Sequence, residues 1–287
     1  MKYVYPKLSD KDFYIIRIGG LGLGNMLFTY AKAVLYARDH GARLIWPTWV
    51  SIPVGQILRR ESNKRFYHDL FQNRIGAVSG FQKLRLLWTR KKDIAVMEGM
   101  EGEFEPIAGK ENSEYLYRHF QTILQERNRK AMEFEPGNGI CMHIRLGDFT
   151  RGTEADLKAG NPNTSIPIEW YINVIRQIRD AVSETLPVYI FSDGSREELQ
   201  DILALPGVQR VTFGTAIGDI LAMSKARLFV ASGSTFSRWV RYLGRMNTIT
   251  YPGQLKQHLL EEDEPAFEIE AEQIPEEYLD RLKKQLQ

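Results

Sequence analysis

The segment Ile140–Asp148 reads ICMHIRLGD, an apolar run that ends in charged and polar residues. It follows Pro136–Gly139, whose PGNG sequence is typical of a turn or linker. The apolar part predicts a strand over Ile140–Arg145. Strands and helices alternate on both sides of it, which favours an α/β fold with parallel sheets.

The alternation covers most of the chain. Downstream, the expected elements are a helix over Pro167–Val182, a strand over Pro187–Phe191, a helix over Arg196–Leu205, a strand over Val208–Phe213, a helix over Ala216–Lys225, a strand over Arg227–Ala231, a helix over Phe236–Leu243, a strand over Thr248–Tyr251 and a terminal helix over Glu276–Leu286. Upstream they are a strand over Phe13–Ile18, a helix over Asn25–His40 and a strand over Arg43–Trp46. Residues 50–135 have no clear pattern. We predict two doubly wound halves, 1–137 and 138–258, followed by an acidic tail with a helix, 259–287.

Composition narrows the class of protein. The 287 residues suit about two domains. With 38 Lys and Arg against 36 Asp and Glu, the net charge of +2 gives no reason to expect a nucleic-acid partner. The single cysteine, Cys141, excludes an internal disulfide and a Cys-rich zinc site. No apolar run approaches the ~20 residues of a membrane span, and the N-terminus lacks a signal-peptide core. We expect a soluble, cytoplasmic protein.

The charges are unevenly distributed. Gln56–Lys92 contains ten Lys and Arg and two acids, whereas Glu261–Glu277 contains nine acids and no Lys or Arg. In the basic stretch, aromatic residues and leucines are interleaved with the cations. Such a segment could lie on an anionic membrane or hold a phosphorylated acceptor, or it could be an ordinary amphipathic helix facing the core. The acidic segment is interpreted as solvated surface.

A glycine-rich loop, Gly19–Gly24, joins the first expected strand to the first expected helix. Glycines let a backbone approach a ligand, and a helix N-terminus offers free N–H groups to an anion. The dinucleotide fingerprint and the Gly-Lys-Ser/Thr of a P-loop are both absent, and no acid follows Arg43–Trp46 to hold a ribose. The alternative is a turn needed only for packing.

Polar residues occur at the end of the expected strand Ile140–Arg145 and directly after it. His143 and Arg145 are two residues apart, so on a strand they point to one side. Ligands bind at the carboxyl ends of strands in open α/β sheets, and arginine is suited to phosphate. Asp148 could orient Arg145 or cap a helix. The alternative is a surface Arg–Asp pair beside a buried histidine.

Similar chemistry follows later strands. Asp193 ends one expected strand, Asp219 lies in the first turn of an expected helix, and Ser234–Phe236 joins a strand to a helix. Hydroxyl and free N–H groups at such a junction suit a phosphate. Each residue could instead be a helix cap.

Together these motifs resemble those of one known family, the alpha-1,2-fucosyltransferases of glycosyltransferase family 11. Gly22–Ala31, GLGNMLFTYA, is similar to the family's GLGNQMFQYA, and His143–Asp148, HIRLGD, resembles HVRRGDY. Phe191–Asp193 matches the start of FSDD. Asp219–Ser224 and Ser234–Trp239 together look like DLxLMS…NSSFSWW. Four motifs occur in the family's order.

The resemblance implies a GT-B fold, in which two Rossmann-like halves face a central cleft. It implies inverting transfer of L-fucose from GDP-fucose, in a 1,2-linkage, to a glycan acceptor of a bacterial surface polysaccharide. It implies no metal and no other cofactor. Arg145 would hold the β-phosphate, and Asp148 is the second catalytic candidate. The donor-binding positions carried over by motif are Gly22, Gly24, Asn25, His143, Arg145, Asp193, Asp219, Ser234, Thr235 and Phe236.

The sequence departs from these motifs at three positions. Met26 replaces a glutamine, Leu146 replaces the second arginine of HVRRGDY, and Arg238 replaces the first tryptophan of the WW pair. Two alternatives therefore stay open: transfer of another nucleotide-linked sugar, and a catalytically silent nucleotide-sugar or glycan-binding protein. A lipid-linked acceptor would place the protein at the inner face of the plasma membrane, with Gln56–Lys92 in contact with it.

Overall fold

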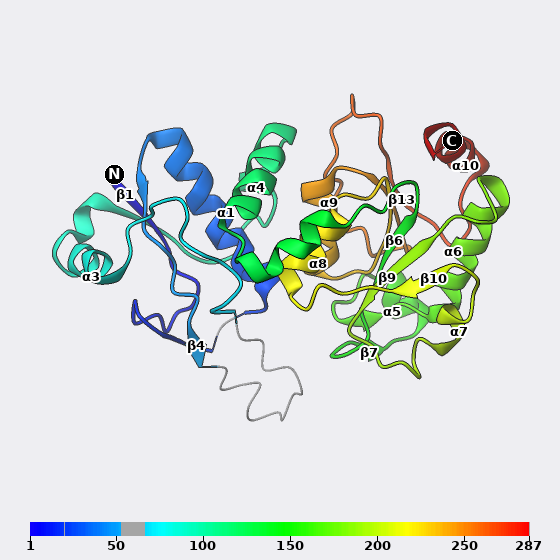
Figure 1. The fold of residues 1–287 in the computed structure, drawn as a ribbon, viewed down its shortest axis with the longest axis horizontal. Coiled ribbons are helices and arrows are strands. Elements are labelled where there is room, and N and C mark those ends of the chain that lie inside the picture. The colour runs from blue at the N-terminus through cyan, green and yellow to red at the C-terminus, as the bar shows by residue number, and fades with distance from the viewer. Residues whose placement is uncertain (20, 53–66, 287) are drawn as a thin grey trace. The chain divides into compact units, whose positions relative to one another are not determined.

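The computed structural model describes residues 1–19, 21–52 and 67–286. It divides the chain into two compact units, Met1–Arg129 and Lys130–Gln287, which Figure 1 shows with their elements labelled. Each unit contains a parallel sheet with helices packed on it, so the predicted α/β class is confirmed. The division predicted from the sequence lies a few residues further along, in the turn Pro136–Gly139.

Unit 1 is built on a sheet of three parallel strands in the order β3-β1-β5. The helix α1 packs on one face of this sheet, and it ends at Gly41, whose left-handed backbone (φ 60°) lets its N–H donate to the carbonyl of Ala37. The helix α3 packs on the other face. The elements are β1 Tyr3–Pro6, β2 Arg17–Ile18, α1 Leu23–His40, β3 Arg43–Leu44, β4 Ser51–Ile52, α3 Gly80–Thr89, β5 Ile94–Met97 and α4 Lys110–Ile123, with the 3-10 turns η1 Lys91–Asp93, η2 Glu105–Ile107 and η3 Glu126–Glu133.

The strand predicted over Phe13–Ile18 is largely wrong. Only Arg17–Ile18 is extended and paired, as β2, and its partner is β4 rather than the three-stranded sheet. Phe13 and Ile15 are 58% and 66% exposed, and Tyr14 has a positive φ of 70°. The strand that precedes α1 in the sheet is β1, for which the sequence predicts no strand. The glycine loop therefore follows a short ribbon, not a sheet strand.

Unit 2 contains a six-stranded parallel sheet in the order β10-β9-β6-β11-β12-β13. Counted along the chain from β6, these strands lie in the order 3-2-1-4-5-6, which is the Rossmann order. The elements are β6 Ile140–Ile144, β7 Thr150–Arg151, α5 Glu154–Lys158, β8 Thr164–Ser165, α6 Ile168–Ala181, β9 Val188–Ser192, α7 Gln200–Leu203, β10 Val208–Arg210, α8 Ala216–Met223, β11 Leu228–Ala231, α9 Thr235–Gly244, β12 Asn247–Thr250, β13 Glu268–Glu270 and α10 Glu276–Leu286.

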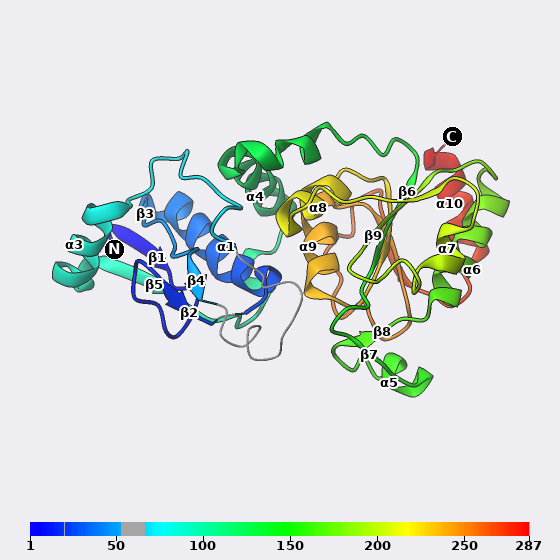
Figure 2. The same cartoon turned by 60° about the horizontal axis from the view of Figure 1, so that its bottom comes forward.

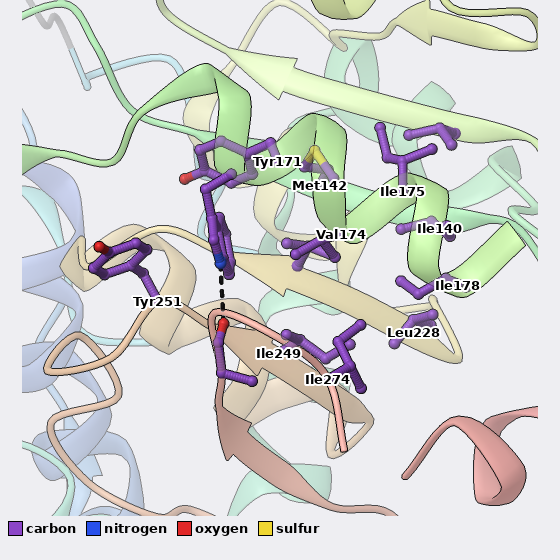
Figure 3. Packing of buried hydrophobic residues seen from close by; sticks show 14 of the residues in the cluster. Ile140, Met142, Tyr171, Val174, Ile175, Ile178, Leu228, Ile249, Tyr251 and Ile274 are labelled. Atoms are coloured by element: carbon purple, nitrogen blue, oxygen red, sulfur yellow. Dashed lines mark hydrogen bonds between the residues drawn. The ribbon is translucent and has the colours of Figure 1, made fainter. Parts of the chain in front are cut away.

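Helices cover both faces of this sheet. Figure 2 shows α8 and α9 on one face and α6, α7 and α10 on the other. On the second face, side chains of neighbouring strands meet those of α6, and Figure 3 shows Ile140, Leu228 and Ile249 packed toward Val174 and Ile178. Strand residues alternate between faces. Ile140, Met142 and Ile144 therefore face α6, whereas Cys141 and His143 face α8 and α9.

The segment 259–287 is part of unit 2. Its strand β13 pairs with β12, and α10 packs against α6. The buried ion pair between Arg241 of α9 and Glu268 of β13 (2.8 Å) fixes this edge of the sheet to α9. Across the described part of the chain, no helix has both the length and the apolarity required to cross a lipid bilayer.

Candidate functional site

The three strands whose ends carry the predicted site residues are neighbours in the sheet, in the order β9-β6-β11. Because all three run parallel, the segments after Ile144, Ser192 and Ala231 lie at the same edge. The chain moves from β6 to β9 in one direction and later returns to β11 on the opposite side of β6. This is a topological switch point, where open α/β sheets bind their ligands.

His143 lies on β6 and is buried against the start of α9. Its Nδ1 is 2.7 Å from the Ser237 hydroxyl and 3.0 Å from the Ser232 hydroxyl. Its ring stacks on Phe236, with the ring centroids 4.6 Å apart. Burial, with the neighbouring charge of Arg145, lowers the pKa of His143 to about 3. The imidazole is therefore neutral, and it connects β6 to the serines that precede and begin α9.

Arg145 follows β6 directly, and two carboxylates hold its guanidinium. Nη1 is 2.7 Å from Oδ2 of Asp193, and Nη2 is 2.5 Å from Oδ1 of Asp148. The side chain remains 24% exposed. Since each carboxylate takes a different terminal nitrogen, the plane of the guanidinium is fixed while part of it stays open to solvent. An arginine held in this way is suited to a phosphate.

Asp193, at the end of β9, holds two parts of the neighbouring loop. Besides the ion pair with Arg145, its Oδ1 accepts a hydrogen bond from the backbone N–H of Leu146 (2.9 Å). Gly147 lies against it so closely that an added Cβ would be 2.5 Å from Asp193 Oδ2. The glycine of the HIRLGD motif is therefore required by the close approach of the Asp193 carboxylate.

Leu146 points to the other side of the strand end. Its side chain packs against the same hydrophobic cluster as Ile140, Met142 and Ile144, on the α6 face. The alternation of β6 thus continues past its last residue, with His143 on one side and Leu146 on the other. Leu146, which stands where the family motif has an arginine, therefore lies on the side of the loop that packs on the core.

The N-terminus of α9 follows β11. Ser234 is the N-cap, and its hydroxyl accepts a hydrogen bond from the N–H of Ser237 (3.2 Å). Thr235 and Phe236 are the first two helical residues, and the first turn contains no acid. The partial positive charge of the helix end is therefore not neutralised by a side chain of its own first turn. This end is suited to an anion.

Asp219 lies in the first turn of α8 and accepts hydrogen bonds from the segment that follows β10. Its Oδ1 is 2.6 Å from the N–H of Phe213, and its Oδ2 is 3.2 Å from the hydroxyl of Thr212. Burial raises the pKa of Asp219 to about 6. Its observed role is to close the turn between β10 and α8, and β10 is two strands away from β6 in the sheet.

The remaining predicted residues, Gly22, Gly24 and Asn25, lie in unit 1 at the start of α1. Gly22 is the N-cap and accepts a backbone hydrogen bond from Asn25 (3.1 Å). A Cβ at Gly22 would have no atom within 4 Å, so local packing does not require this glycine. Gly20 of the same loop lies outside the described residues.

Several residues that hold these segments in place do not stand out in the sequence. In unit 1, the buried Arg17 donates from Nη1 to the carbonyl of Gly19 (2.7 Å) and from Nε to the carbonyl of Thr48 (3.1 Å), so it fixes the start of the glycine loop. In unit 2, the hydroxyls of Ser232 and Ser237 are hydrogen-bonded to Nδ1 of His143. The sequence feature that could have pointed to Arg17 is a positively charged residue inside an apolar run, directly before the glycine loop.

Among the described residues, no three or more His, Cys, Asp or Glu side chains lie together in a group that could hold a metal ion. The sequence has one Asp-x-Asp, Asp10–Asp12, a spacing that can hold a cation. Here Asp12 is engaged within unit 1. Its Oδ2 accepts from the Tyr5 hydroxyl (2.5 Å) and its Oδ1 from the N–H of Tyr14 (2.8 Å).

The neutral state of His143 predicts a pH effect on stability. The unfolded chain takes up a proton on this histidine below about pH 6.5, whereas the folded protein resists protonation down to about pH 3. The contribution of neutral His143 to the unfolding free energy is therefore present above pH 6.5 and is lost as the pH falls. We expect the unfolding free energy of the parent, relative to His143→Gln, to fall by about 2 kcal/mol between pH 7 and pH 5.

Urea denaturation of both proteins at the two pH values measures this difference. Asp219 titrates in both proteins, so its effect on the unfolding free energy cancels in the comparison. Its raised pKa acts with the opposite sign: the stability that Asp219 contributes is full below about pH 4 and is lost as the pH rises through about 6. A relative stability of the two proteins that does not change with pH would contradict the buried, neutral histidine.

Comparison with known proteins identifies a family and a fold. Residues 110–270, more than half of the chain, match the family model of glycosyl transferase family 11. A solved structure of the alpha-1,6-fucosyltransferase NodZ, soaked with GDP-fucose, is 15% identical; the match covers 87% of this chain and 94% of that chain with a TM-score of 0.50.

Two further NodZ structures match equally well. The form co-crystallised with GDP and the selenomethionine form from Bradyrhizobium are each 16% identical, with the same coverage and a TM-score of 0.50. At this identity the likeness concerns the fold, and it confirms the predicted GT-B type. No curated protein matches the sequence.

Proposed function

The chain belongs to glycosyl transferase family 11, and on this premise we propose that it transfers L-fucose from GDP-fucose to a hydroxyl of a glycan. The transfer is proposed to form a 1,2-linkage, to invert the anomeric centre and to require no metal. One NodZ structure was soaked with GDP-fucose and another was co-crystallised with GDP, and both share the fold of this chain. Fold alone does not specify a donor, so the residues of the site carry the proposal.

One observation carries it: the guanidinium of Arg145, fixed by Asp193 and Asp148, lies at the switch point next to the strand that leads into α9. A nucleoside diphosphate is an anion that gains negative charge as the sugar leaves. A fixed cation and the N–H groups of a helix N-terminus stabilise that charge without reorganising, which is the largest catalytic contribution in many enzymes.

The proposed roles follow from these positions. Arg145 binds the β-phosphate and stabilises the leaving group, and Ser234, Thr235 and Phe236 offer hydroxyl and backbone N–H groups to the pyrophosphate. Asp148 orients Arg145, and its carboxylate, 45% exposed, is also the candidate base for the acceptor hydroxyl. The other proposed donor-binding residues are Gly22, Gly24 and Asn25 of unit 1 and His143, Asp193 and Asp219 of unit 2.

A different nucleotide sugar is the second candidate, and Leu146 favours it. Where the family motif has a second arginine, this chain has an apolar side chain that packs on the core. The loop after β6 therefore has one cation fewer than the family motif. Because Leu146 lies on the opposite side of the loop from His143, we retain GDP-fucose as the leading donor.

The acceptor and the location belong to the same proposal. We propose a glycan of a bacterial surface polysaccharide as the acceptor, bound by unit 1, and a cytoplasmic location. The single cysteine is buried and unpaired, which suits a reducing compartment.

Calorimetry with GDP, GDP-fucose, UDP-sugars and NAD, each with and without EDTA, tests the proposal. We expect GDP and GDP-fucose to bind with an affinity that EDTA does not change, because the anion partners are protein groups. Binding of NAD without GDP would overturn the proposal, and tight binding of a UDP-sugar alone would favour the second candidate. Release of GDP in the presence of glycan acceptors distinguishes an enzyme from a silent binding protein.

A further inference from the structure

In the part of the chain that the structure describes, large apolar side chains are exposed in only one of the two units. Among the described residues, the ten that are most open to solvent all lie between Met1 and Val96. The two extreme cases are Phe81, 82% exposed, and Trp88, 79% exposed, and both belong to α3. A helix that leaves two aromatic side chains in water has a face that its own unit does not cover.

The two aromatic residues lie on one face of α3. They are seven residues apart, which is close to two helical turns, and Arg85 lies between them on the same face. The opposite face is buried through Lys83, Leu86 and Leu87. Figure 1 shows α3 beside β1, at the outside of unit 1, with one side turned away from the sheet.

Buried contacts fix the rotation of α3 about its axis. The ammonium of Lys83 donates to the hydroxyl of Thr48 (2.9 Å) and lies 5.0 Å from the ring centroid of Tyr5. Leu86 and Leu87 belong to the small hydrophobic cluster that covers this side of the sheet. The outward direction of Phe81 and Trp88 is therefore set by the packing of the inner face.

Cations surround the exposed aromatic pair. Arg85, Arg90, Lys91 and Lys92 are exposed, and the sole acid between residues 80 and 93 is Asp93. The end of α3 and the turn η1 thus carry a concentrated positive charge beside exposed apolar surface. We call Phe81, Arg85, Trp88, Lys91 and Lys92 the α3 face.

We propose that the α3 face binds the surface of an anionic lipid bilayer. Tryptophan partitions to the boundary between headgroups and acyl chains, and exposed lysines and arginines are attracted to anionic headgroups. The charge complementarity and the paired aromatic anchors suit a helix lying in the plane of the interface. The contact depends on α3 and the turn η1 and does not require the proposed reaction. The part of the basic stretch at residues 56–66 lies outside the described residues and is not included.

Vesicle flotation tests the proposal with the full chain. We compare vesicles of phosphatidylcholine alone with vesicles of phosphatidylcholine and phosphatidylglycerol, at low and at physiological ionic strength. The protein is expected to float with the vesicles that contain phosphatidylglycerol, more at low salt, and to stay in solution with phosphatidylcholine alone.

Two double variants separate the apolar and charged contributions. Lys91→Glu/Lys92→Glu is expected to lower the vesicle partition coefficient about 30-fold or more, since each lysine near an anionic surface adds about a factor of five. Phe81→Ser/Trp88→Ser is expected to lower it about tenfold or more. Matched controls are Lys283→Glu/Lys284→Glu, two exposed cations of α10, and Phe13→Ser, an exposed aromatic outside α3; both should bind like the parent.

Several results would overturn the proposal. Absence of flotation with phosphatidylglycerol at low salt is one, and loss of binding in the α10 control equal to that in the α3 variant is another. Binding to soluble polyglutamate without binding to vesicles would identify a polyanion partner instead. Circular dichroism and urea denaturation of each variant show whether it is folded, so a folding defect is not mistaken for a lost contact.

Discussion

Replacing Arg145 by alanine is expected to lower kcat about 10³-fold with the donor saturating, which corresponds to about 4 kcal/mol of transition-state stabilisation. The reason is geometric as well as electrostatic. Asp193 and Asp148 hold two different nitrogens of the guanidinium, so the charge that meets the leaving diphosphate is already in place. GDP affinity should fall as well, because GDP carries the same phosphates as the leaving group.

Arg145→Lys sharpens this prediction. Lysine keeps the charge but is a point donor that cannot take both carboxylates in the geometry of a planar fork. We expect it to recover only a small part of the lost kcat. Arg151→Ala is the matched control, because Arg151 is an exposed arginine of β7 a few residues further along the chain. Full turnover by Arg145→Ala with saturating GDP-fucose would refute the assignment.

The sequence predicted unit 2 more accurately than unit 1. The strands of unit 2 are buried apolar runs between clear turn residues, so length and composition locate them; the strand expected over Pro187–Phe191 is found at Val188–Ser192. In unit 1 the aromatic and β-branched run at Phe13–Ile18 indicated a strand, but composition does not report burial. Phe13 and Ile15 face solvent there, and β1, which ends in Pro6, is the central strand.

The site shows a similar limit. The sequence alone predicts that His143, Arg145, Asp193 and Ser234 lie at or just after the ends of parallel strands. The strand order β9-β6-β11 brings those strand ends together. Which side chains pair could not be deduced. The contact between Arg145 and Asp193 depends on the register of β6 against β9, which places Ile144 opposite Ser192. Hydrogen bonds from distant serines to His143 likewise depend on packing.

Asp193→Ala is expected to lower kcat about 10²-fold, because Asp193 holds the guanidinium of Arg145 in place. The substitution leaves the guanidinium with Asp148 alone and leaves the N–H of Leu146 without its acceptor. Asp193→Asn separates the two contributions, because an amide oxygen still accepts from Leu146 but carries no charge for Arg145. A merely structural role would lower stability in both variants without altering kcat of the folded protein.

Gly147→Ala is expected to disturb the contact between Asp193 and Arg145 by a steric clash. The new Cβ would lie 2.5 Å from Asp193 Oδ2, and that carboxylate cannot move without weakening its bonds to Arg145 and to Leu146. We therefore expect a loss of kcat comparable to that in Asp193→Ala. The double variant should lose little more than either single one, because both changes break the same contact. Losses that multiply would contradict this prediction, because they would show that Gly147 affects kcat by a route other than its contact with Asp193.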